Sequence, residues 1–404
     1  MNRSLLEGVR IADFTWAWAG PYATTLLAFM GAEVIKIESM KRPDLSRRST
    51  FTTGQKFSGL DQSSVFADLN FNKLSVTLNL SHPKGVALAK QIVDISDVVT
   101  ENMRPGVMGR LGLDYTALVK IKPDIIMLSS SACGSTGPEC HNIGYAATFA
   151  ALGGISHITG HADGPPVPLT GAIDLRSATT SAFAILAALN FRQRTGQGQY
   201  IDLSSQETID VLIGDVLMDY TMNQRVASRS GNRDATMAPH NCYRCKGEDM
   251  WVSIAVANDN EWKSLCQAMG NPKLIKNKMF SSSHSRWENQ DELDPLIEQW
   301  TINLTPYEVM DTLQKVGVAA IPSFNSDQLL NDPHSNQRDL YSEVEHPVMG
   351  KRIVVNPPWK LSATPAQIRH PAPLFGQHNK YVFGDLLEMP KKEIAQLMEE
   401  KVIY

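Results

Sequence analysis

Asp174 is the residue whose type and position best suit covalent chemistry in this 404-residue chain. It follows Gly171-Ala-Ile and stands immediately before a long stretch of helical periodicity. At the N-terminus of a helix, unpaired backbone N–H groups and the positive end of the dipole favour the ionised carboxylate. That form attacks electrophilic carbonyls, so Asp174 is a candidate nucleophile. The alternative is an ordinary helix N-cap, which residue type and position alone favour.

The helix that would carry Asp174 is predicted from the apolar residues that follow it. They recur at the spacing of one helical face: Ala178, Ala182, Ile185 and Leu189. Arg192 and Arg194 suit the negative end of a helix dipole, and Gly196 is the residue type that ends a helix in the left-handed conformation. The sequence therefore predicts a helix that ends at Gly196.

Composition limits the classes of protein to consider. A hydrophobic content of 43% and a charged content of 20% are typical of a globular protein, and the net charge of -4 argues against nucleic-acid binding. The N-terminus has no signal-peptide pattern, and the apolar run 182–189 is too short to cross a bilayer. Five scattered cysteines fit reduced thiols. We therefore expect a cytoplasmic protein with no membrane contact.

The N-terminal stretch predicts a βαβ unit. Residues 8–14 and 32–38 read as strands, and residues 22–30 between them read as a helix that ends at Gly31. No G-x-G-x-x-G follows the first strand. The dinucleotide-binding fingerprint is therefore missing, and we predict neither NAD nor FAD.

Strands and helices continue to alternate along the chain. Further strands are predicted over residues 70–80, 97–102 and 124–131, and a helix over 83–93. This alternation is typical of an α/β fold with a mostly parallel, Rossmann-like sheet and helices on both faces. A smaller α+β domain should follow. We predict a large domain over 1–205, a linker helix and small domain over 206–325, and a return to the large domain over 326–404.

A basic loop is predicted over residues 41–62, after the second strand. It carries Lys41, Arg42, Arg47 and Arg48. Ligands of open α/β sheets bind at the carboxyl ends of the strands, so these cations are candidates for phosphate binding. A solvated loop without a ligand is an equally good interpretation.

Other candidate residues carry weaker signals. Cys242 and Cys245 have the spacing of a zinc or redox pair, but no second ligand pair follows, so we predict no metal. His141 is either a general base or a structural histidine, and Tyr145 either a hydroxyl donor or a packed aromatic residue. Trp16 and Trp18 line a pocket or belong to the core.

Taken together, the motifs resemble the class III CoA-transferases, which include formyl-CoA transferase and carnitine CoA-transferase. The resemblance spans nearly the whole chain, in order. It rests on DFTWAWAGPYATTLLAFMGAEVIKIE, NFNKLSVTLNL, ENMRPGVMGRLGLDY, GAID and RTGQGQYIDLS. It implies that Asp174 is the catalytic aspartate, which forms an acyl-aspartyl anhydride and then an aspartyl-CoA thioester. CoA thioesters are then substrates, and no permanently bound cofactor is implied.

The resemblance also implies the positions that contact CoA. They are Ala17, Trp18, Ala19, Lys73, Asn102, Met103, Arg110, Leu111 and Tyr145, with Arg104 as a further cation within reach. Two interlocked ring-like subunits are implied as well. We expect either a homodimer or a heteromer with a related subunit.

Several positions depart from the family pattern. Formyl-CoA transferase has a histidine and a glutamine where this chain has Trp16 and Trp18, and its glycine-rich small-domain loop corresponds to residues 234–237. Met40 replaces an arginine that holds the nucleotide, which leaves Lys41 or Arg42 as substitutes. The tryptophans favour a bulky or aromatic acid. The WAWAGP string resembles the benzylsuccinate CoA-transferase subgroup.

Three other functions are compatible with the same residues. An α-methylacyl-CoA racemase would move a proton with Asp174 and a histidine, and His141 lies close to that histidine in the sequence. A non-catalytic subunit of a heteromeric transferase would not need the Asp174 nucleophile. A plain nucleotide-binding module is a more distant alternative.

Overall fold

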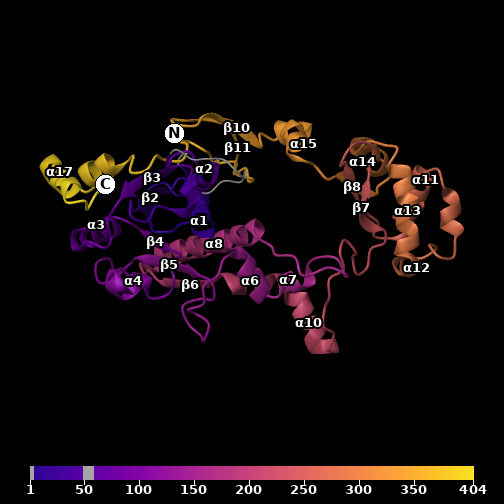
Figure 1. Ribbon diagram of the computed structural model, residues 1–404, viewed down its shortest axis with the longest axis horizontal. Coiled ribbons are helices and arrows are strands. Elements are labelled where there is room, and N and C mark those ends of the chain that lie inside the picture. The colour runs from indigo at the N-terminus through magenta and orange to yellow at the C-terminus, as the bar shows by residue number, and fades with distance from the viewer. Residues whose placement is uncertain (1–3, 49–58) are drawn as a thin grey trace. The chain divides into compact units, whose positions relative to one another are not determined.

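The computed structural model describes residues 4–48 and 59–404. The chain divides into two compact units (Figure 1). The larger comprises Met1–Ser156, Pro168–Arg225 and Asp339–Tyr404, and the smaller comprises His157–Val167 and Val226–Arg338. The predicted boundaries at residues 205 and 325 differ from this division. Helix α9 (Ser205–Asp210) packs on α8 (Gly171–Thr195), and the larger unit therefore continues past residue 205.

The larger unit is built on a six-stranded sheet in which every neighbouring pair is parallel. Its strands are β1 (Arg10–Asp13), β2 (Glu33–Glu38), β3 (Lys73–Thr77), β4 (Val98–Glu101), β5 (Ile126–Ser131) and β6 (Tyr200–Ser204). The order is β3-β2-β1-β4-β5-β6, so the direction of winding reverses between β1 and β4. At such a switch point, ligands bind outside the carboxyl ends of the strands. The predicted parallel sheet is confirmed.

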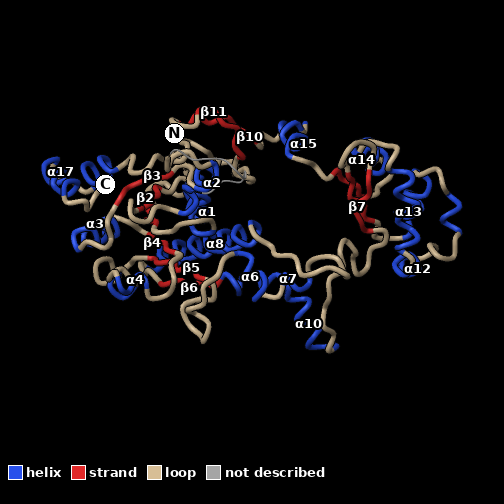
Figure 2. Tube along the Cα trace, viewed as in Figure 1, coloured by secondary structure: helices blue, strands red, loops and turns tan. Residues whose placement is uncertain are grey.

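Helices cover both faces of this sheet, as predicted (Figure 2). Ile11 of β1 packs in one core with α1 (Ala19–Phe29) and α8, whereas its neighbour Ala12 packs in the other with α3 (Pro83–Asp94) and α17 (Lys391–Glu399). Successive strand residues point to opposite faces, which explains this division. The remaining helices of the larger unit are α2 (Ser64–Leu69), α4 (Val107–Arg110), α5 (Tyr115–Leu118), α6 (Ala146–Leu152), α7 (Ile155–Ile158, which runs into the smaller unit), α10 (Gly214–Asn223) and η4 (Lys380–Leu386), with the short turns η1 (Leu45–Arg48) and η2 (Val211–Ile213).

Helix α8 follows the prediction closely. Ala178, Ala182 and Ile185 are buried, and the last two pack in one core with residues of α1, beside which α8 lies in Figure 1. Gly196 ends the helix with φ of 74°, a conformation that glycine adopts without a steric penalty. Among the described residues, α8 is the single helix long and apolar enough to cross a membrane by length and composition, although the sequence predicted a shorter apolar run. One face of this helix packs against α1 and the sheet, and 39% of its apolar window is buried.

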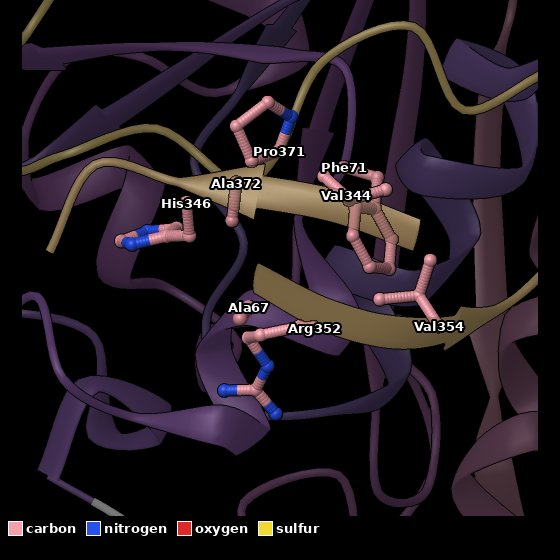
Figure 3. A pocket seen from close by; sticks show the side chains of 8 residues that line it. All are labelled: Ala67, Phe71, Val344, His346, Arg352, Val354, Pro371 and Ala372. Atoms are coloured by element: carbon pink, nitrogen blue, oxygen red, sulfur yellow. The ribbon is translucent and has the colours of Figure 1, made fainter. Parts of the chain in front are cut away.

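A β-hairpin and the last segment of the chain complete the larger unit. The hairpin consists of β10 (Tyr341–His346) and β11 (Gly350–Val355). Together with α2 and the segment after it, the hairpin encloses a small pocket lined by Phe71, His346 and Arg352 (Figure 3). Further along, His378 and Asn379 hydrogen bond along the outer edge of β3. This edge is therefore covered, as exposed edges of sheets usually are.

The smaller unit contains an antiparallel sheet of β7 (His240–Arg244), β8 (Trp251–Ala255) and β9 (Ala319–Pro322), in that order. Its helices are α11 (Asp259–Ala268), η3 (Pro272–Lys276), α12 (Ser283–Glu288), α13 (Gln290–Thr301), α14 (Pro306–Gln314), α15 (Ser326–Asn331) and α16 (Pro333–Gln337). The predicted small α+β domain is confirmed. Buried apolar residues from α11, α13 and α14 pack against the sheet around Trp262.

Candidate active site

Asp174 lies in the first turn of α8 but is not its N-cap. The helix begins at Gly171, and its cap residue, Thr170, makes no side-chain capping hydrogen bond. Asp174 is half-buried, and burial raises the pKa of its carboxyl group to about 6. The sequence predicted that the helix N-terminus would favour the ionised form, but desolvation is the larger effect. The ordinary capping role is therefore wrong, and the carboxylate stands in a partly desolvated position.

Trp18 approaches the first turn of α8 from the β1–α1 connection. One carbon of its ring, Cζ3, lies 4.0 Å from the point where Gly171 would carry a β-carbon. Gly171 and Asp174 are three residues apart on the helix and so share a face. The structure therefore brings the Trp18 ring to the same helical turn as the candidate nucleophile.

Tyr145 belongs to a second element that meets this turn. It precedes α6 as the N-cap, and the next residue, Ala146, packs in one buried cluster with Ile173 and Ile209. The Tyr145 side chain itself is 68% exposed. It is therefore not the packed aromatic residue that the sequence allowed, and its side chain is accessible to solvent.

Asn102, at the carboxyl end of β4, contacts the backbone of the β1–α1 connection. Its Oδ1 accepts a hydrogen bond from the Trp16 N–H at 2.9 Å, and its Nδ2 donates to the Trp16 carbonyl at 2.8 Å. A β-carbon on Gly20 would lie 2.5 Å from Thr15 Cβ, so only glycine permits this close approach at the start of α1. Asn102 thus joins β4 to the segment that carries Trp18.

The predicted CoA contacts that follow Asn102 lie in residues 103–111, which include α4. The Met103 N–H donates to Glu101, whereas Arg104 and Arg110 are exposed and Leu111 is half-buried. Both arginine side chains are therefore accessible to an anionic ligand. Their contact with CoA stays a prediction.

Lys73 differs from the other predicted contacts because its side chain is fully buried. Its ammonium group donates to Asp13 Oδ2 at 3.1 Å, to the Pro21 carbonyl at 2.7 Å and to Asn70 Oδ1 at 3.0 Å. Burial lowers its pKa to about 8. All three N–H groups have partners within the protein, so direct contact with CoA would require these bonds to break.

The four cations of the predicted basic loop differ in their exposure to solvent. Residues 49–58 of this loop lie outside the described part of the chain. Arg47 is completely buried and forms ion pairs with Glu38 at 2.7 Å and Asp61 at 2.8 Å, so it is a structural residue. Arg42 is exposed, and its guanidinium lies 4.3 Å from the centre of the Trp16 ring. Lys41 and Arg48 are exposed. The accessible cations are therefore Lys41, Arg42 and Arg48.

Glu101 is a buried carboxyl group that the sequence analysis did not single out. It ends β4 at the carboxyl edge of the sheet, and burial raises its pKa to about 7. The residue type was visible directly before Asn102, but a short apolar strand that ends in glutamate usually places the charge in solvent. Its burial depends on neighbours from other strands, including Ser129 of β5.

The remaining sequence candidates show no catalytic arrangement. His141 is exposed in the loop before α6. Cys242 contacts the Ser253 hydroxyl, whereas Cys245 is buried, and all five cysteines are free. In the described ranges, 4–48 and 59–404, no group of His, Cys, Asp or Glu side chains is arranged to hold a metal ion.

Comparison with known proteins identifies relatives over the whole length of the chain. The family model described as CoA-transferase family III matches residues 6–379. A succinyl-CoA–D-citramalate CoA-transferase from Chloroflexus aurantiacus is 35% identical over 399 residues, which are 98% of each chain. The beta subunit of a succinyl-CoA–L-malate CoA-transferase from the same organism is 32% identical over 404 residues, again 98% of each. The crystal structure of a CAIB/BAIF family protein from Brucella suis matches with a TM-score of 0.85 and 26% identity, over 95% of this chain and 99% of that one.

Proposed function

Because the chain belongs to CoA-transferase family III, as the sequence resemblance implied, we propose that it moves CoA from succinyl-CoA to a dicarboxylic acid. One observation of the site carries this proposal: Asp174 stands half-buried in the first turn of α8, beside Trp18. The proposed donor follows from relatives named for succinyl-CoA. CoA is a substrate of this family rather than a resident cofactor.

Asp174 would transfer CoA in four balanced steps. A carboxylate oxygen attacks the succinyl-CoA carbonyl, and the C–S bond breaks to leave an aspartyl-succinyl anhydride and CoA thiolate. The thiolate attacks the aspartyl carbonyl, which releases succinate and leaves an aspartyl-CoA thioester. The acceptor carboxylate then attacks this thioester, and the released thiolate attacks the acceptor carbonyl. The anhydride and thioester intermediates conserve the free energy of the starting thioester, and Asp174 ends as the free carboxylate.

Burial of Asp174 suits this role. A carboxylate that has lost part of its hydration is a stronger nucleophile than one in bulk water, and a pKa of about 6 leaves it mostly ionised at neutral pH. Each attack on a carbonyl creates an oxyanion, which nearby backbone N–H groups can stabilise. The backbone N–H groups in the first turn of α8 are the candidate donors on its own helix.

The acceptor class is supported by the relatives and by charge. Citramalate and malate, named in the two relatives, are both dicarboxylic acids. Lys41, Arg42 and Arg104 are exposed cations that follow the carboxyl ends of β2 and β4. Benzylsuccinate is also a dicarboxylic acid, so the aromatic acceptor predicted from the two tryptophans stays within this class. The subgroup itself stays a prediction.

An acceptor assay tests the function. With succinyl-CoA as donor, we expect glutarate to be converted to its CoA thioester at least about 10-fold faster than pentanoate, which has the same length but lacks the second carboxylate. Mass spectrometry of the CoA products measures both rates, and D-citramalate, L-malate and benzylsuccinate complete the panel. Equal rates for glutarate and pentanoate would contradict the substrate class. Solvent deuterium at the α-carbon of a branched acyl-CoA, without CoA exchange, would indicate a racemase instead.

We also propose that the chain assembles with a second copy through α10. No residue of this helix is buried, although it carries Leu217, Met218 and Met222, which are 52%, 60% and 73% exposed. An apolar helix without a buried face is typical of a subunit interface. The relative named as a beta subunit shows that heteromers occur in the family. The five free cysteines fit a reducing compartment, and we propose the cytoplasm.

The double variant Met218→Glu/Met222→Glu tests this interface. Two buried charges at an interface cost more than the apolar contacts contribute, so we expect the dimer to dissociate into monomers, as measured by light scattering after gel filtration. Met398→Glu, on the exposed face of α17 at 49% exposure, is the matched control and should leave the mass unchanged. A wild-type protein that is already monomeric would instead favour a heteromer with a related subunit.

A further inference from the structure

Five consecutive polar groups of the backbone between β1 and α1 are each bonded to a side chain. The Thr15 N–H donates to Asp13 Oδ1 at 2.9 Å, and the Thr15 carbonyl accepts from Lys36 Nζ at 2.9 Å. Asn102 pairs with both backbone groups of Trp16. The Ala17 N–H donates to Asp44 Oδ1 at 2.9 Å. Side chains from β1, from β2, from the residue after β4 and from the loop after β2 therefore fix this segment.

Ala17 holds a backbone conformation that alanine rarely adopts. Its φ is 68°, in the left-handed region where the β-carbon crowds the backbone. Strained residues of this kind persist only where the surrounding structure over-determines them, and they cluster at functional sites. The five side-chain bonds supply that constraint.

The bond to Ala17 comes from a completely buried ion pair. Lys36 Nζ and Asp44 Oδ2 are 2.8 Å apart, and the two side chains are 0% and 1% exposed. The other oxygen of Asp44 accepts from the Ala17 and Ser46 N–H groups, while Lys36 also reaches the Thr15 carbonyl. A buried ion pair contributes little net stability compared with apolar residues of similar size, so fold stability alone does not account for this one.

The position of the Trp18 ring suggests a role for the Lys36–Asp44 ion pair. Trp18 follows Ala17 directly, and its ring lies against Gly171 in the first turn of α8. A change of Ala17 to negative φ would redirect the chain at this point and move the Trp18 ring away from that turn. The conformation of Ala17 therefore sets the position of Trp18 relative to Asp174.

We propose that Lys36 and Asp44 are positioning residues of the transferase reaction: through the left-handed Ala17, they hold Trp18 beside the acyl group that Asp174 attacks. This inference rests on the proposed function. Neither residue needs to touch the substrate, because both act through the backbone of residues 15–17. Misplacement of a positioning group by about 1 Å costs about 100-fold in rate in enzymes generally.

The double variant Lys36→Met/Asp44→Ala tests the proposal. It removes both charges together, so no unpaired buried charge remains and the protein should fold. We expect a kcat lower by about 10- to 100-fold with KM for succinyl-CoA changed less than about 3-fold, because the acyl end is misplaced while Arg104 and Arg110, the cations predicted to contact CoA, lie outside the displaced segment. Hydrogen–deuterium exchange of residues 15–19 should accelerate at least about 10-fold, while exchange in β4 and β5 is unchanged.

Adding Ala17→Gly to the double variant provides a rescue. Glycine adopts positive φ without strain, so we expect it to restore kcat several-fold in the double variant. A purely structural role of the ion pair would not produce this rescue. Unchanged kcat in the double variant, or exchange of residues 15–19 at the wild-type rate, would overturn the proposal.

Ala17→Val keeps the inference testable if the double variant does not fold. A β-branched residue at positive φ is strongly disfavoured, so kcat should fall and residues 15–19 should exchange faster. Glu388→Val, at an exposed position with φ of 53°, is the matched control and should keep the wild-type kcat. Equal losses in both variants would overturn the proposal. If the wild type itself transfers no CoA, the proposed function fails, and the exchange measurements still test the conformational part.

Discussion

Replacement of Asp174 by asparagine is expected to abolish CoA transfer, with kcat lower by about 10⁴-fold or more. Asparagine has nearly the same shape as aspartate but no carboxylate oxygen that can form an anhydride. A role in binding alone would raise KM and leave most of kcat. Initial rates with succinyl-CoA and glutarate separate the two cases, and Asp163→Asn, at an exposed position in the smaller unit, is the matched control.

The covalent intermediate should be visible in the wild type and absent from the variant. After incubation with succinyl-CoA without an acceptor, the peptide that contains Asp174 should carry the mass of CoA and lose it on treatment with hydroxylamine. Asp174→Asn should show no adduct. An adduct that persists in the variant would mean that another residue is the nucleophile. A binding subunit without catalysis would show no adduct in either protein.

Because the pKa of Asp174 is raised, both kcat/KM and the stability of the fold should depend on pH. The value of kcat/KM should rise as pH increases through about 6, because the ionised carboxylate attacks. The folded protein binds the proton more tightly than the unfolded chain, so this group lowers stability as pH rises from about 4 to about 6. At pH 7, Asp174→Asn should therefore be more stable than the wild type by about 1–2 kcal/mol, with the difference vanishing below about pH 4.

Replacement of Asp13 by alanine is expected to destabilise the larger unit by about 3–5 kcal/mol. Asp13 is completely buried at the end of β1, where it accepts hydrogen bonds from Lys73, Thr15, Thr24 and Thr100. Its removal leaves the Lys73 ammonium buried without its charge partner. Hydrogen exchange of the β1 and β2 amides in increasing urea measures the loss in this unit alone.

A surface pair provides the control for this stability prediction. Glu343 forms an ion pair with Lys351 at 2.8 Å, but the two side chains are 58% and 69% exposed. Glu343→Ala should therefore cost less than about 1 kcal/mol. Comparable losses for Glu343→Ala and Asp13→Ala would contradict the explanation based on a buried charge.

The contribution of the Asp13 carboxylate to the free energy of unfolding should depend on pH. Burial raises the pKa of Asp13, but the charges of Lys73 and Lys36 outweigh burial and leave it below 3.8. The unfolded chain therefore binds the proton more tightly, and stability is lost as pH falls through the lowered pKa. The wild type should lose this stability below about pH 4, whereas Asp13→Ala should show a smaller dependence there.

The elements that carry the site were predictable because their signals are local. Apolar periodicity placed the strand before Trp16, and Gly196 marked the end of α8. The parallel sheet followed from the alternation of strands and helices. Even so, β6 was not recognised as a strand, because the short run YIDLS alternates weakly and follows a glycine-rich turn.

The charged interior of the site was not predictable from the sequence. Lysine and arginine side chains are almost always exposed unless they are paired, but the structure buries Lys36, Lys73 and Arg47. Their partners come from other segments of the fold: Lys73 of β3 pairs with Asp13 of β1, which is 60 residues away, while Lys36 and Glu38 of β2 pair with Asp44 and Arg47 of the loop after it. Only the folded sheet brings such pairs together. For the same reason, the basic loop appeared to offer Arg47 to a ligand, whereas the structure uses it to hold Glu38.

The covered edge of β3 has a consequence for how the protein is synthesised. His378 and Asn379 bond to Ser75 and Thr77, and the Asn79 N–H donates to the Val402 carbonyl, so more than 300 residues separate the two sides of this edge. The ribosome therefore synthesises β3 long before it synthesises the C-terminal segment that covers the edge of this strand. During translation, β3 therefore presents unpaired N–H and C=O groups, and a nascent chain in this state is the form most open to chaperones and to aggregation.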